Sequence, residues 1–523
     1  MSTPVKYPVG EQSFEQLRKG GYLYVDKTRF IEKIVNGTKY YFLGRPRRFG
    51  KSLFLSTLKC FYEGKRELFK GLHIDCADWK WDCYPVLYLD LNTRRYQDDS
   101  KLDLLLSDFF EEYEVKYGIE APAENTDISG RFGRLIRRVA EKTGKSVVIL
   151  VDEYDKPLVN NIHNPARFEM YRGELAELYS NLKSSADYIE LVFLTGVSRF
   201  GKLSVFSDLN NISDISFLNK YSGICGISEE ELLENFEEGI CGLAEACGVT
   251  REKTLAELKR RYDGYHFAAV SPDMYNPYSL LNVFAAEQYG NYWIESGTPT
   301  LLLKQLKRTD ADLSRIVEAK SDRVLLSGLD LNNMNPVALF YQTGYLTIKG
   351  TSDNGNIFHL GLPNDEVKEG FLKYILPAYA NLHDENSTVF VYQFRKEMEN
   401  GHVDDFMARL KSMFAGVGHD HDMEMENERN VQNVLFIFFK LLGLSVDCEY
   451  RTSNGRIDIL VRTRDYVYIM ELKFDKSAAE ALDQIERKEY ALPWSVDDRT
   501  VIGIGINYSK VTRTIDEWLA RPL

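Results

Sequence analysis

The chain has 523 residues, of which 44% are hydrophobic and 27% charged, and its mean hydropathy is -0.32. This composition is typical of a folded protein with several buried cores and excludes wholesale disorder. The 65 basic and 78 acidic residues give a net charge of -13, which argues against bulk electrostatic attachment to nucleic acid or an anionic membrane. A local basic groove stays compatible with it. At roughly 150 residues per domain, the length predicts two to four domains.

Cysteine usage and hydropathy indicate the expected location of the chain. The seven cysteines are scattered and form no C-x-x-C pair, which predicts reduced thiols in the cytoplasm and no disulfide framework. The N-terminus lacks the apolar stretch of a secretory signal. The most apolar run, residues 434–446, is interrupted by Lys440, and at about 13 residues it is shorter than the roughly 20 that a bilayer requires. We therefore expect a soluble, cytoplasmic protein without a membrane partner.

Four short apolar runs in the N-terminal part indicate strands that are buried on both faces. They are residues 40–43, 86–91, 147–151 and 191–195. Continuous apolar runs, as opposed to alternating ones, are typical of a parallel sheet that helices cover on both sides. After Lys51, apolar residues recur at helical spacing. The expected fold class is therefore α/β, in which ligands bind at the carboxyl ends of the strands.

The pattern of the sequence changes near Ser228. Ser228 and Glu231 have the spacing of a helix capping box, and the residues that follow are mostly helical in pattern. A stretch rich in Asn, Gly and Asp then precedes a final unit, which begins near Glu428 with a long apolar helix. We expect this unit to continue with a two-stranded segment, a second helix and a last strand at residues 500–507.

The first predicted strand runs directly into the sequence G-R-P-R-R-F-G-K-S, residues 44–52, and a helix follows. This order is that of a phosphate-binding P-loop. Backbone N–H groups at the helix start cradle phosphate, Lys51 reaches the outer phosphates and the Ser52 hydroxyl binds Mg²⁺. The first glycine of the usual G-x-x-x-x-G-K-[ST] pattern falls on Arg45, with Gly44 one place earlier.

Polar residues at two other strand ends complete this candidate site. Asp152 and Glu153 follow the run 147–151; Asp152 can hold Mg²⁺ through water, and Glu153 can polarise the water that attacks a γ-phosphate. Thr195, with Ser198 and Arg199, ends the next strand, and these residues could sense that phosphate. The candidate nucleotide contacts are Gly44, Arg45, Arg47, Arg48, Gly50, Lys51, Ser52, Asp152, Thr195 and Ser198.

Each of these motifs also has a purely structural interpretation. A lysine and a serine often begin a solvated surface helix, and acidic residues often follow a strand as helix caps. The loop arginines can equally form a solvated basic loop. The order and spacing of the motifs together favour nucleotide binding over these alternatives.

With these motifs and several others, the chain resembles bacterial AAA-ATPase-like proteins that carry a PD-(D/E)XK nuclease-like domain at the C-terminus. The matching segments are YVDKT (24–28), RPRRFGKS (45–52), VDEYDKP (151–157), TGVSRF (195–200), RYDGYHF (261–267), YNPYSLLN (275–282) and the pair GRIDIL and ELK (455–460 and 471–473). The resemblance implies an additional-strand P-loop ATPase core, a helical lid and then the nuclease fold. An arginine in place of the first glycine is normal for this family. No chemistry is assigned to YVDKT or RYDGYHF.

The resemblance divides the chain into four parts. The expected boundaries are 1–225 for the AAA-ATPase-like P-loop domain, 226–330 for the helical lid, 331–400 for a connector and 401–523 for the PD-(D/E)XK nuclease-like domain. We hypothesise that nucleotide drives a conformational change in the first two parts, and that this change gates or positions the C-terminal site. The motifs indicate two sites, but they do not show that the sites communicate.

A second set of charged residues lies near the C-terminus. Residues 456–461 and 466–474 have the pattern of two strands joined by a turn, whose centre we place at residues 464–465. In that register Asp458 lies opposite Glu471, with Cβ atoms about 5 Å apart. Two carboxylates this close repel each other unless a cation lies between them, which predicts a divalent metal.

Other polar residues extend this second candidate site. Lys473 shares a strand face with Glu471 and could orient or help deprotonate a water for attack on a phosphodiester. The spacing D-x12-E-x-K resembles the PD-(D/E)XK nuclease core. Glu428, at the start of the preceding helix, could add a metal ligand, and Gln484, on the following helix, could position water or phosphate. The alternative is a cross-strand salt-bridge ladder. Residues 451–490 carry no net charge, so any nucleic-acid groove must come from the tertiary arrangement.

The predicted function is an ATP-binding and ATP-hydrolysing protein whose metal-dependent nuclease-like domain acts on nucleic acid, with DNA favoured over RNA. The expected catalytic residues are Glu153, Asp458, Glu471, Lys473 and Gln484, and the expected Mg²⁺ ligands are Ser52, Asp152, Glu428, Asp458 and Glu471. The chain could also form a homo-oligomer. Two alternatives stay open: a nucleotide-dependent binding switch with an inert nuclease fold, and an interaction protein with a vestigial P-loop.

Overall fold

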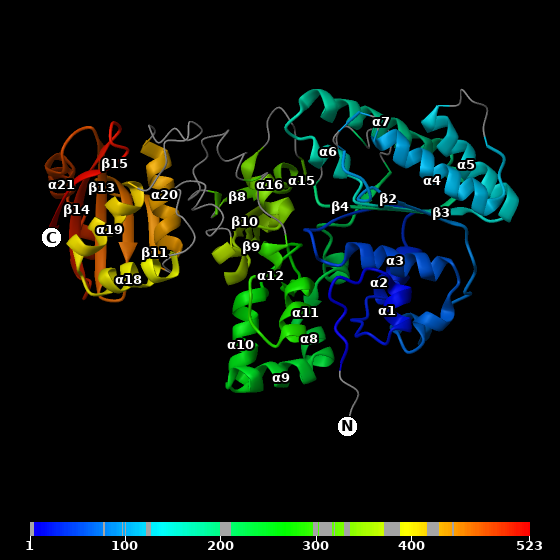
Figure 1. The fold of residues 1–523 in the computed structure, drawn as a ribbon, viewed down its shortest axis with the longest axis horizontal. Helices are drawn as coiled ribbons and strands as arrows, with labels where there is room; N and C mark the ends of the chain where they lie inside the picture. The colour runs from blue at the N-terminus through cyan, green and yellow to red at the C-terminus, as the bar shows by residue number, and fades with distance from the viewer. Residues whose placement is uncertain are drawn as a thin grey trace. The chain divides into compact units, whose positions relative to one another are not determined.

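The structure, a computed structural model, describes most of the chain as two compact units (Figure 1). The segments outside the description are 1–4, 77–78, 97, 100, 122–126, 199–204, 206–210, 297–301, 303–315, 318, 329–334, 371–386, 416–427 and 442–443, together with the side chains of 327, 387–392, 428–430, 437 and 441. One unit comprises residues 1–296 and 319–367, and the other comprises residues 297–318 and 368–523. No helix in the described part is both long and apolar enough to cross a bilayer.

A five-stranded parallel sheet is the centre of the first unit. Its strands are β1 (Tyr40–Gly44), β2 (Val86–Asp90), β3 (Val147–Asp152), β4 (Ile189–Gly196) and β5 (Ser213–Asp214). The spatial order is β2-β3-β4-β1-β5, so β4 lies between β1 and β3. The four predicted apolar runs are confirmed as β1 to β4, and the α/β fold class is confirmed with them. The short β5 gave no pattern in the sequence.

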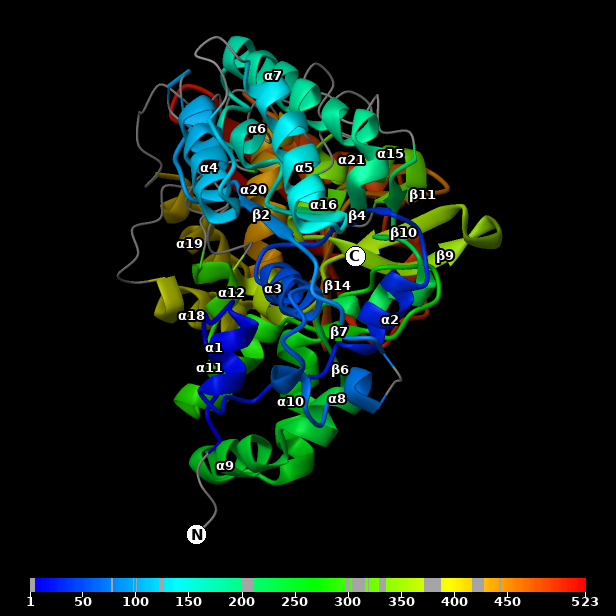
Figure 2. The same cartoon turned by 90° about the vertical axis from the view of Figure 1, so that its right-hand side faces the viewer.

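Helices cover both faces of this sheet. α3 (Lys51–Tyr62) follows β1 and packs on one face, with α1 (Phe14–Lys19) against it. The other face is covered by α4 (Lys101–Tyr117), α5 (Ile128–Thr143), α6 (Lys156–Asn160) and α7 (Pro165–Ser184), which Figure 2 shows gathered on one side. This double cover explains why the strands are apolar at every position and do not alternate.

A helical region follows the sheet in the first unit. It contains α8 (Glu229–Asn235), α9 (Glu237–Cys247), α10 (Arg251–Tyr262), α11 (Pro277–Ala286) and α12 (Tyr292–Glu295), with the short pair β6 (Ile227–Ser228) and β7 (Met274–Tyr275). The predicted capping box of Ser228 and Glu231 is present at the start of α8. Leu232, Phe236 and Leu258 belong to the buried core of the region.

A small antiparallel sheet, of order β8-β10-β9, completes the first unit. Its strands are β8 (Lys320–Asp322), β9 (Thr347–Ser352) and β10 (Ile357–Gly361), and the helices beside it are α15 (Arg323–Ser327) and α16 (Pro336–Thr343). Residues 331–400, which we expected to be a connector, therefore contain α16, β9 and β10, and also α18 (Ser387–Glu399) of the second unit.

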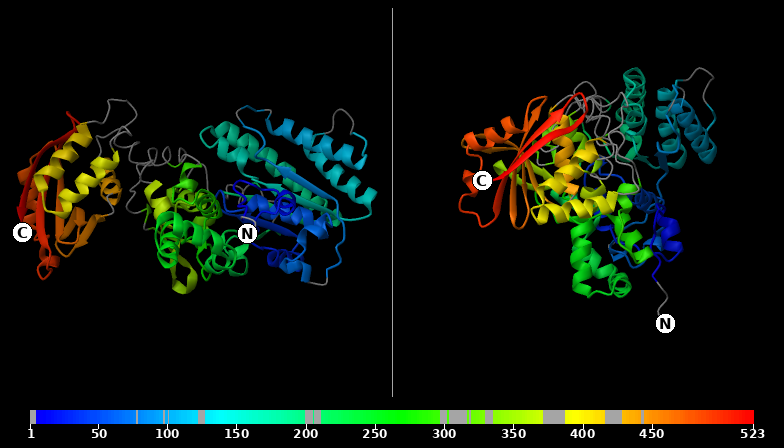
Figure 3. Two further views of the ribbon diagram at one scale, coloured as in Figure 1. Left: turned by 60° about the horizontal axis from the view of Figure 1, so that its bottom comes forward. Right: turned by 60° about the vertical axis from the view of Figure 1, so that its left-hand side comes forward.

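The second unit is built on a sheet whose five strands follow one another in chain order. The strands are β11 (Ser445–Thr452), β12 (Gly455–Arg462), β13 (Tyr466–Phe474), β14 (Thr500–Ser509) and β15 (Thr514–Pro522), and the helices are α18 (Ser387–Glu399), α19 (Val403–Ala415), α20 (Glu428–Leu441) and α21 (Ala478–Arg487). All pairs are antiparallel except β13 and β14, which α21 connects. Figure 3 shows the preceding helices, in yellow and orange, against one face of the sheet.

Glycines in β14 let α21 pack closely on the sheet. A Cβ atom at Gly505 would lie 2.1 Å from the carbonyl oxygen of Ala478 in α21. The predicted hairpin, second helix and last strand are present, whereas β11 and the largely exposed β15 were not expected. Strand β15 carries polar residues on both faces, so it lacks the alternation that marks a half-buried strand.

Candidate functional sites

The loop between β1 and α3 surrounds the ammonium group of its own lysine. Lys51 is buried, and its Nζ donates to the carbonyl oxygens of Arg45 and Pro46 at 3.0 Å each. Gly50 immediately before it has a φ of 94°, a left-handed conformation that glycine adopts without a steric penalty. The loop therefore begins a helix whose first N–H groups stay available for an anion.

The carboxyl ends of β3 and β4 bring polar groups together beside this loop. Thr195 Oγ1 donates to Asp152 Oδ1 at 2.6 Å, and both residues are buried. Thr195 pairs in register with Leu43 of β1, which leads directly into the loop. Asp152 therefore lies two strands from β1, about 10 Å at the usual strand spacing.

A cleft of about 320 Å³, open to solvent, lies beside these elements. Lys51, Ser52 and Glu153 line it together. Glu153 has a φ of 49°, which turns the chain sharply after β3. The cleft also contains Arg47, Arg48, Gly50, Asn92, Lys156 and Tyr278 among its lining residues. Glu153 after β3 and the loop and helix start at residues 47–52 therefore line one cleft, whereas Asp152 and Thr195 are not among its lining residues.

Two of the expected nucleotide contacts are engaged elsewhere. The Gly44 N–H donates to Ser216 Oγ at 2.7 Å, and the Arg45 N–H donates to the Gly196 carbonyl at 3.2 Å. The Arg45 guanidinium is buried, donates to the Ser216 carbonyl at 2.8 Å, and lies 4.2 Å from the ring centre of Phe267. Gly44 and Arg45 thus hold the loop in place in this structure, and their expected contacts with nucleotide stay a prediction.

Ser198, whose expected role in sensing a phosphate stays a prediction, is hydrogen-bonded to a buried carboxylate. Its N–H donates to Asp155 Oδ2 at 2.6 Å, and its hydroxyl donates to the same oxygen. Asp155 is buried, and this burial raises the pKa of its carboxyl. Asp155 and Ser198 therefore fix the segment after β4 against the segment after β3. The sequence signal for Asp155 was its place in VDEYDKP; Arg199 lies outside the described residues.

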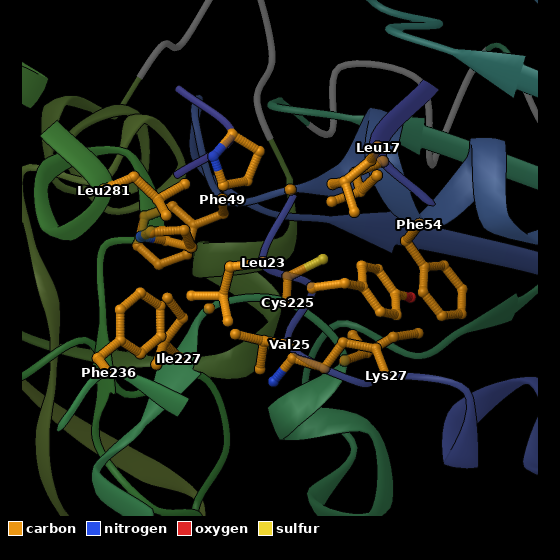
Figure 4. Close-up of a pocket in the computed structure, with 17 residues that line it drawn as sticks. Leu17, Leu23, Val25, Lys27, Phe49, Phe54, Cys225, Ile227, Phe236 and Leu281 are labelled. Atoms are coloured by element: carbon orange, nitrogen blue, oxygen red, sulfur yellow. The ribbon is translucent and has the colours of Figure 1, made fainter. Parts of the chain in front are cut away.

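An apolar pocket with a cavity volume of about 80 Å³ adjoins the cleft (Figure 4). The two spaces share Pro8, Gly50, Leu53, Pro277 and Leu281. Further walls come from Leu23, Val25, Phe49, Phe54, Cys225, Ile227 and Phe236, which Figure 4 labels. The pocket and the cleft therefore offer apolar walls next to a group of cations and N–H donors.

The segment YVDKT, which had no assigned chemistry, joins the helical region to the sheet. Lys27, in the wall of the apolar pocket, donates from Nζ to both carboxylate oxygens of Glu231 on α8, at 2.7 and 2.6 Å. Asp26 accepts from the N–H groups of Thr28 and His73 at 2.7 and 2.6 Å. The motif is therefore explained by structural contacts.

The segment RYDGYHF packs against the loop between β1 and α3. The ring of Phe49 lies 4.7 Å from that of Tyr265 and 5.3 Å from that of Phe267. Gly264 has a φ of 93°, and a Cβ atom there would lie 2.4 Å from the Pro363 carbonyl oxygen. This close approach requires glycine in the motif.

Glu366, a buried carboxyl near the cleft, gives a testable pH dependence. It accepts hydrogen bonds from Ser279 Oγ at 2.7 Å and from the Trp293 N–H at 2.8 Å. Burial raises its pKa from 4.5 to about 7, with Glu295 raising it and Arg261 lowering it by smaller amounts. Because the pKa is raised in the folded state, this group's contribution to stability is present below pH 4.5 and is lost as pH rises through 7.

We therefore expect Glu366→Gln, which keeps a hydrogen-bonding amide, to remove this loss. The free energy of unfolding of the variant, relative to the natural chain, should rise by roughly 3 kcal/mol between pH 4.5 and pH 8. Urea denaturation at several pH values measures the difference. A difference that does not change with pH would contradict the raised pKa.

In the second unit, strands β12 and β13 form the hairpin in the register that we predicted. Ile459 pairs with Met470 and Leu460 with Ile469, so Asp458 and Glu471 are the next residues along the two strands. Both carboxyls are buried. Asp458 Oδ2 accepts from the Leu472 N–H at 2.9 Å.

The other expected residues of this site meet at Glu471. Lys473 Nζ lies 3.0 Å from Glu471 Oε1, and Gln484 Nε2 on α21 donates to the same oxygen. Glu428 begins α20, but its side chain lies outside the described residues. Within the described part of the chain, no three His, Cys, Asp or Glu side chains form a group that could hold a metal. Asp458 and Glu471 thus supply two carboxylates, and a third protein ligand is not described.

The parallel sheet, its loop and the separate nuclease-like sheet define an AAA-ATPase-like α/β protein with a second α/β unit. Residues 8–206 match the family model described as "Predicted AAA-ATPase", and residues 426–518 match that of the "PD-(D/E)XK nuclease superfamily". The chain is 33% identical over 523 residues to the "Uncharacterized protein in vnfD 5'region" of Azotobacter chroococcum mcd 1. The match covers 98% of each of the two chains. The chain belongs to this family of predicted AAA-ATPases with a C-terminal PD-(D/E)XK nuclease-superfamily domain.

Proposed function

We propose that the first unit binds and hydrolyses ATP with Mg²⁺. The observation that carries the proposal is that Lys51, Ser52 and Glu153 line one cleft although they come from separate elements. In the complex, Lys51 would contact the outer phosphates, Ser52 and Asp152 would hold Mg²⁺, and Glu153 would polarise the attacking water. Mg²⁺ would neutralise charge on the phosphates.

The adjoining apolar pocket supports a nucleotide in preference to a free phosphate. It shares Gly50 and Leu53 with the cleft, so a triphosphate held at the start of α3 can place its base between apolar walls. Arg47 and Arg48 are exposed at the cleft and add positive charge, and the Arg48 guanidinium lies 4.7 Å from the ring centre of Tyr278. Binding of a fluorescent ATP analogue in the presence of Mg²⁺, with competition by ATP and by inorganic phosphate, tests this proposal.

For the second unit we propose a metal-dependent nuclease acting on nucleic-acid phosphodiesters, with DNA favoured over RNA. The support is the convergence of Lys473 and Gln484 on Glu471, with Asp458 at the neighbouring position of β12. The two acidic residues fit a divalent cation, because carboxylate oxygens are the ligands that Mg²⁺ prefers. Glu428 is the proposed additional ligand, and Lys473 would orient the attacking water.

A binding switch with an inert nuclease fold is the second candidate. It is compatible with the described contacts, in which Lys473 and Gln484 both bond to Glu471, as they also could in a structural polar cluster. The cleavage assay below decides between the two, because only the enzyme cuts nucleic acid.

We expect Lys473→Ala to lower Mg²⁺-dependent cleavage by about 10²- to 10⁴-fold, the usual contribution of a positioned general acid or base. Cleavage of labelled DNA and RNA on gels, with and without EDTA, measures the effect. Lys476→Ala is the matched control, since Lys476 is exposed three residues further along the chain. Unchanged cleavage by Lys473→Ala would contradict the proposed role, and no cleavage by the natural chain would favour the switch.

A further inference from the structure

The phosphate-binding loop is tied to a tryptophan far along the chain. Trp293 Nε1 on α12 donates to the Arg47 carbonyl oxygen at 3.1 Å, and the indole is buried. Its ring lies 5.3 Å from that of Tyr345. The same loop meets Gly344, where a Cβ atom would lie 2.7 Å from the Cβ of Pro46 and 3.3 Å from the Trp293 ring. The back of the loop is thus tightly enclosed.

The backbone of this tryptophan is held in turn by Glu366. Glu366 accepts from the Trp293 N–H with one carboxylate oxygen and from Ser279 Oγ with the other, at 2.8 and 2.7 Å. Ser279 belongs to α11, which places Pro277 and Tyr278 in the wall of the cleft. One buried carboxyl therefore connects α11, α12 and the loop contact.

These residues lie next to the points where the chain leaves the first unit. The first unit comprises residues 1–296 and 319–367. Trp293 is three residues before the first exit at Ser296, and Glu366 is one residue before the other exit at Val367. Ser296 itself lines the cleft, and its Oγ donates to the Trp293 carbonyl at 2.6 Å. Trp293 and Glu366, beside the two exits, are thus hydrogen-bonded to each other, and Trp293 is also hydrogen-bonded to the loop.

We propose that Trp293 and Glu366 are positioning residues that transmit the state of the phosphate-binding loop to both exits of the chain toward the C-terminal unit. The inference rests on the proposed nucleotide site. Lys51 must release the carbonyls of Arg45 and Pro46 to reach a phosphate. Those carbonyls directly precede that of Arg47, so a change in the loop acts on the Trp293 hydrogen bond. The enclosed back of the loop transfers the change because a packed contact does not deform continuously.

Hydrogen exchange of the full chain tests the proposed role of Trp293 and Glu366. It is measured with and without Mg²⁺ and a non-hydrolysable ATP analogue. In the natural chain, nucleotide should change exchange in segments 292–296 and 363–367 by about tenfold, within the usual range of coupling between sites. Trp293→Phe keeps an aromatic ring but lacks the indole N–H. It should still bind nucleotide and should lose the response at 363–367.

Two control variants should keep the response of segment 363–367 to nucleotide, each compared with the same variant without nucleotide. Glu366→Gln retains an acceptor for the Trp293 N–H, and Trp81→Phe removes an indole N–H that makes no hydrogen bond in the described structure. A response in Trp293→Phe equal to that of the natural chain would overturn the inference. If that variant does not fold, the natural chain is sufficient for the test. Nucleotide binding without any change of hydrogen exchange in segments 292–296 and 363–367 overturns the inference. Absence of nucleotide binding would instead overturn the proposed function, and the inference with it.

Discussion

Replacement of Lys51 by alanine is expected to lower Mg²⁺-dependent ATP turnover by about 10²- to 10³-fold, as for the loss of one preorganised donor to a developing negative charge. Lys51 is the buried cation at the start of α3, and its ammonium bonds to two loop carbonyls. In the proposed complex it exchanges these for phosphate oxygens, and alanine offers no replacement. Release of inorganic phosphate at saturating ATP measures the effect, and binding of a fluorescent ATP analogue separates binding from turnover.

A lysine of the first unit that does not line the cleft serves as the control for this change. Lys70 is exposed, and Lys70→Ala should leave turnover unchanged. Because Lys51 also stabilises the empty loop, thermal unfolding of both variants shows that each is folded at the assay temperature. Normal turnover by a folded Lys51→Ala protein would refute the placement of the nucleotide in this cleft.

The second large effect concerns the ion pair between Lys27 and Glu231. Their side chains are each 11% exposed, and the ammonium contacts both carboxylate oxygens. We expect Lys27→Met, which keeps most of the side-chain volume, to lower the free energy of unfolding by about 3–5 kcal/mol, because it leaves a buried carboxylate without its main partner. Arg29, at 3.3 Å from Glu231, retains part of the compensation. Urea denaturation followed by circular dichroism measures the loss.

A neighbouring pair on the surface gives the matched comparison. Lys259 and Glu229 are 54% and 55% exposed, so Lys259→Met should cost less than about 1 kcal/mol. Adding Glu231→Gln to Lys27→Met should recover part of the loss, since a neutral amide can still accept from the Ser228 N–H, as Glu231 does at 2.9 Å. Equal losses for Lys27→Met and Lys259→Met would show that the buried pair does not stabilise the unit.

Local patterns in the sequence predicted those strands and turns that are determined by residues close together in the chain. A strand buried on both faces must be apolar at every position, so β1 to β4 could be recognised directly. The hairpin register followed from a turn at residues 464–465, which sets every pair between β12 and β13. The Gly50–Ser52 turn into α3 is local in the same sense. Strands without such a pattern, among them β5, β11 and β15, were missed.

Contacts between distant residues required the tertiary structure. Lys27 and Glu231 are 204 residues apart, and Arg47 and Trp293 are 246 residues apart. Their residue types are compatible with solvated charges and ordinary core packing, so nothing in the sequence marks them as partners. The Arg45 side chain is a further example, because it donates to the carbonyl of Ser216, which is 171 residues away in the sequence.

The amino-acid sequence by itself determined the α/β fold class, the candidate phosphate-binding loop and the acidic hairpin, since each depends on periodicity or spacing within a short stretch. Only the tertiary structure decided which of the candidate side chains face the cleft, which ones hold the loop from behind, and that Gln484 meets Glu471. The physical reason is that burial and hydrogen-bond partners are properties of the packed chain, in which segments far apart in sequence compete for the same polar groups.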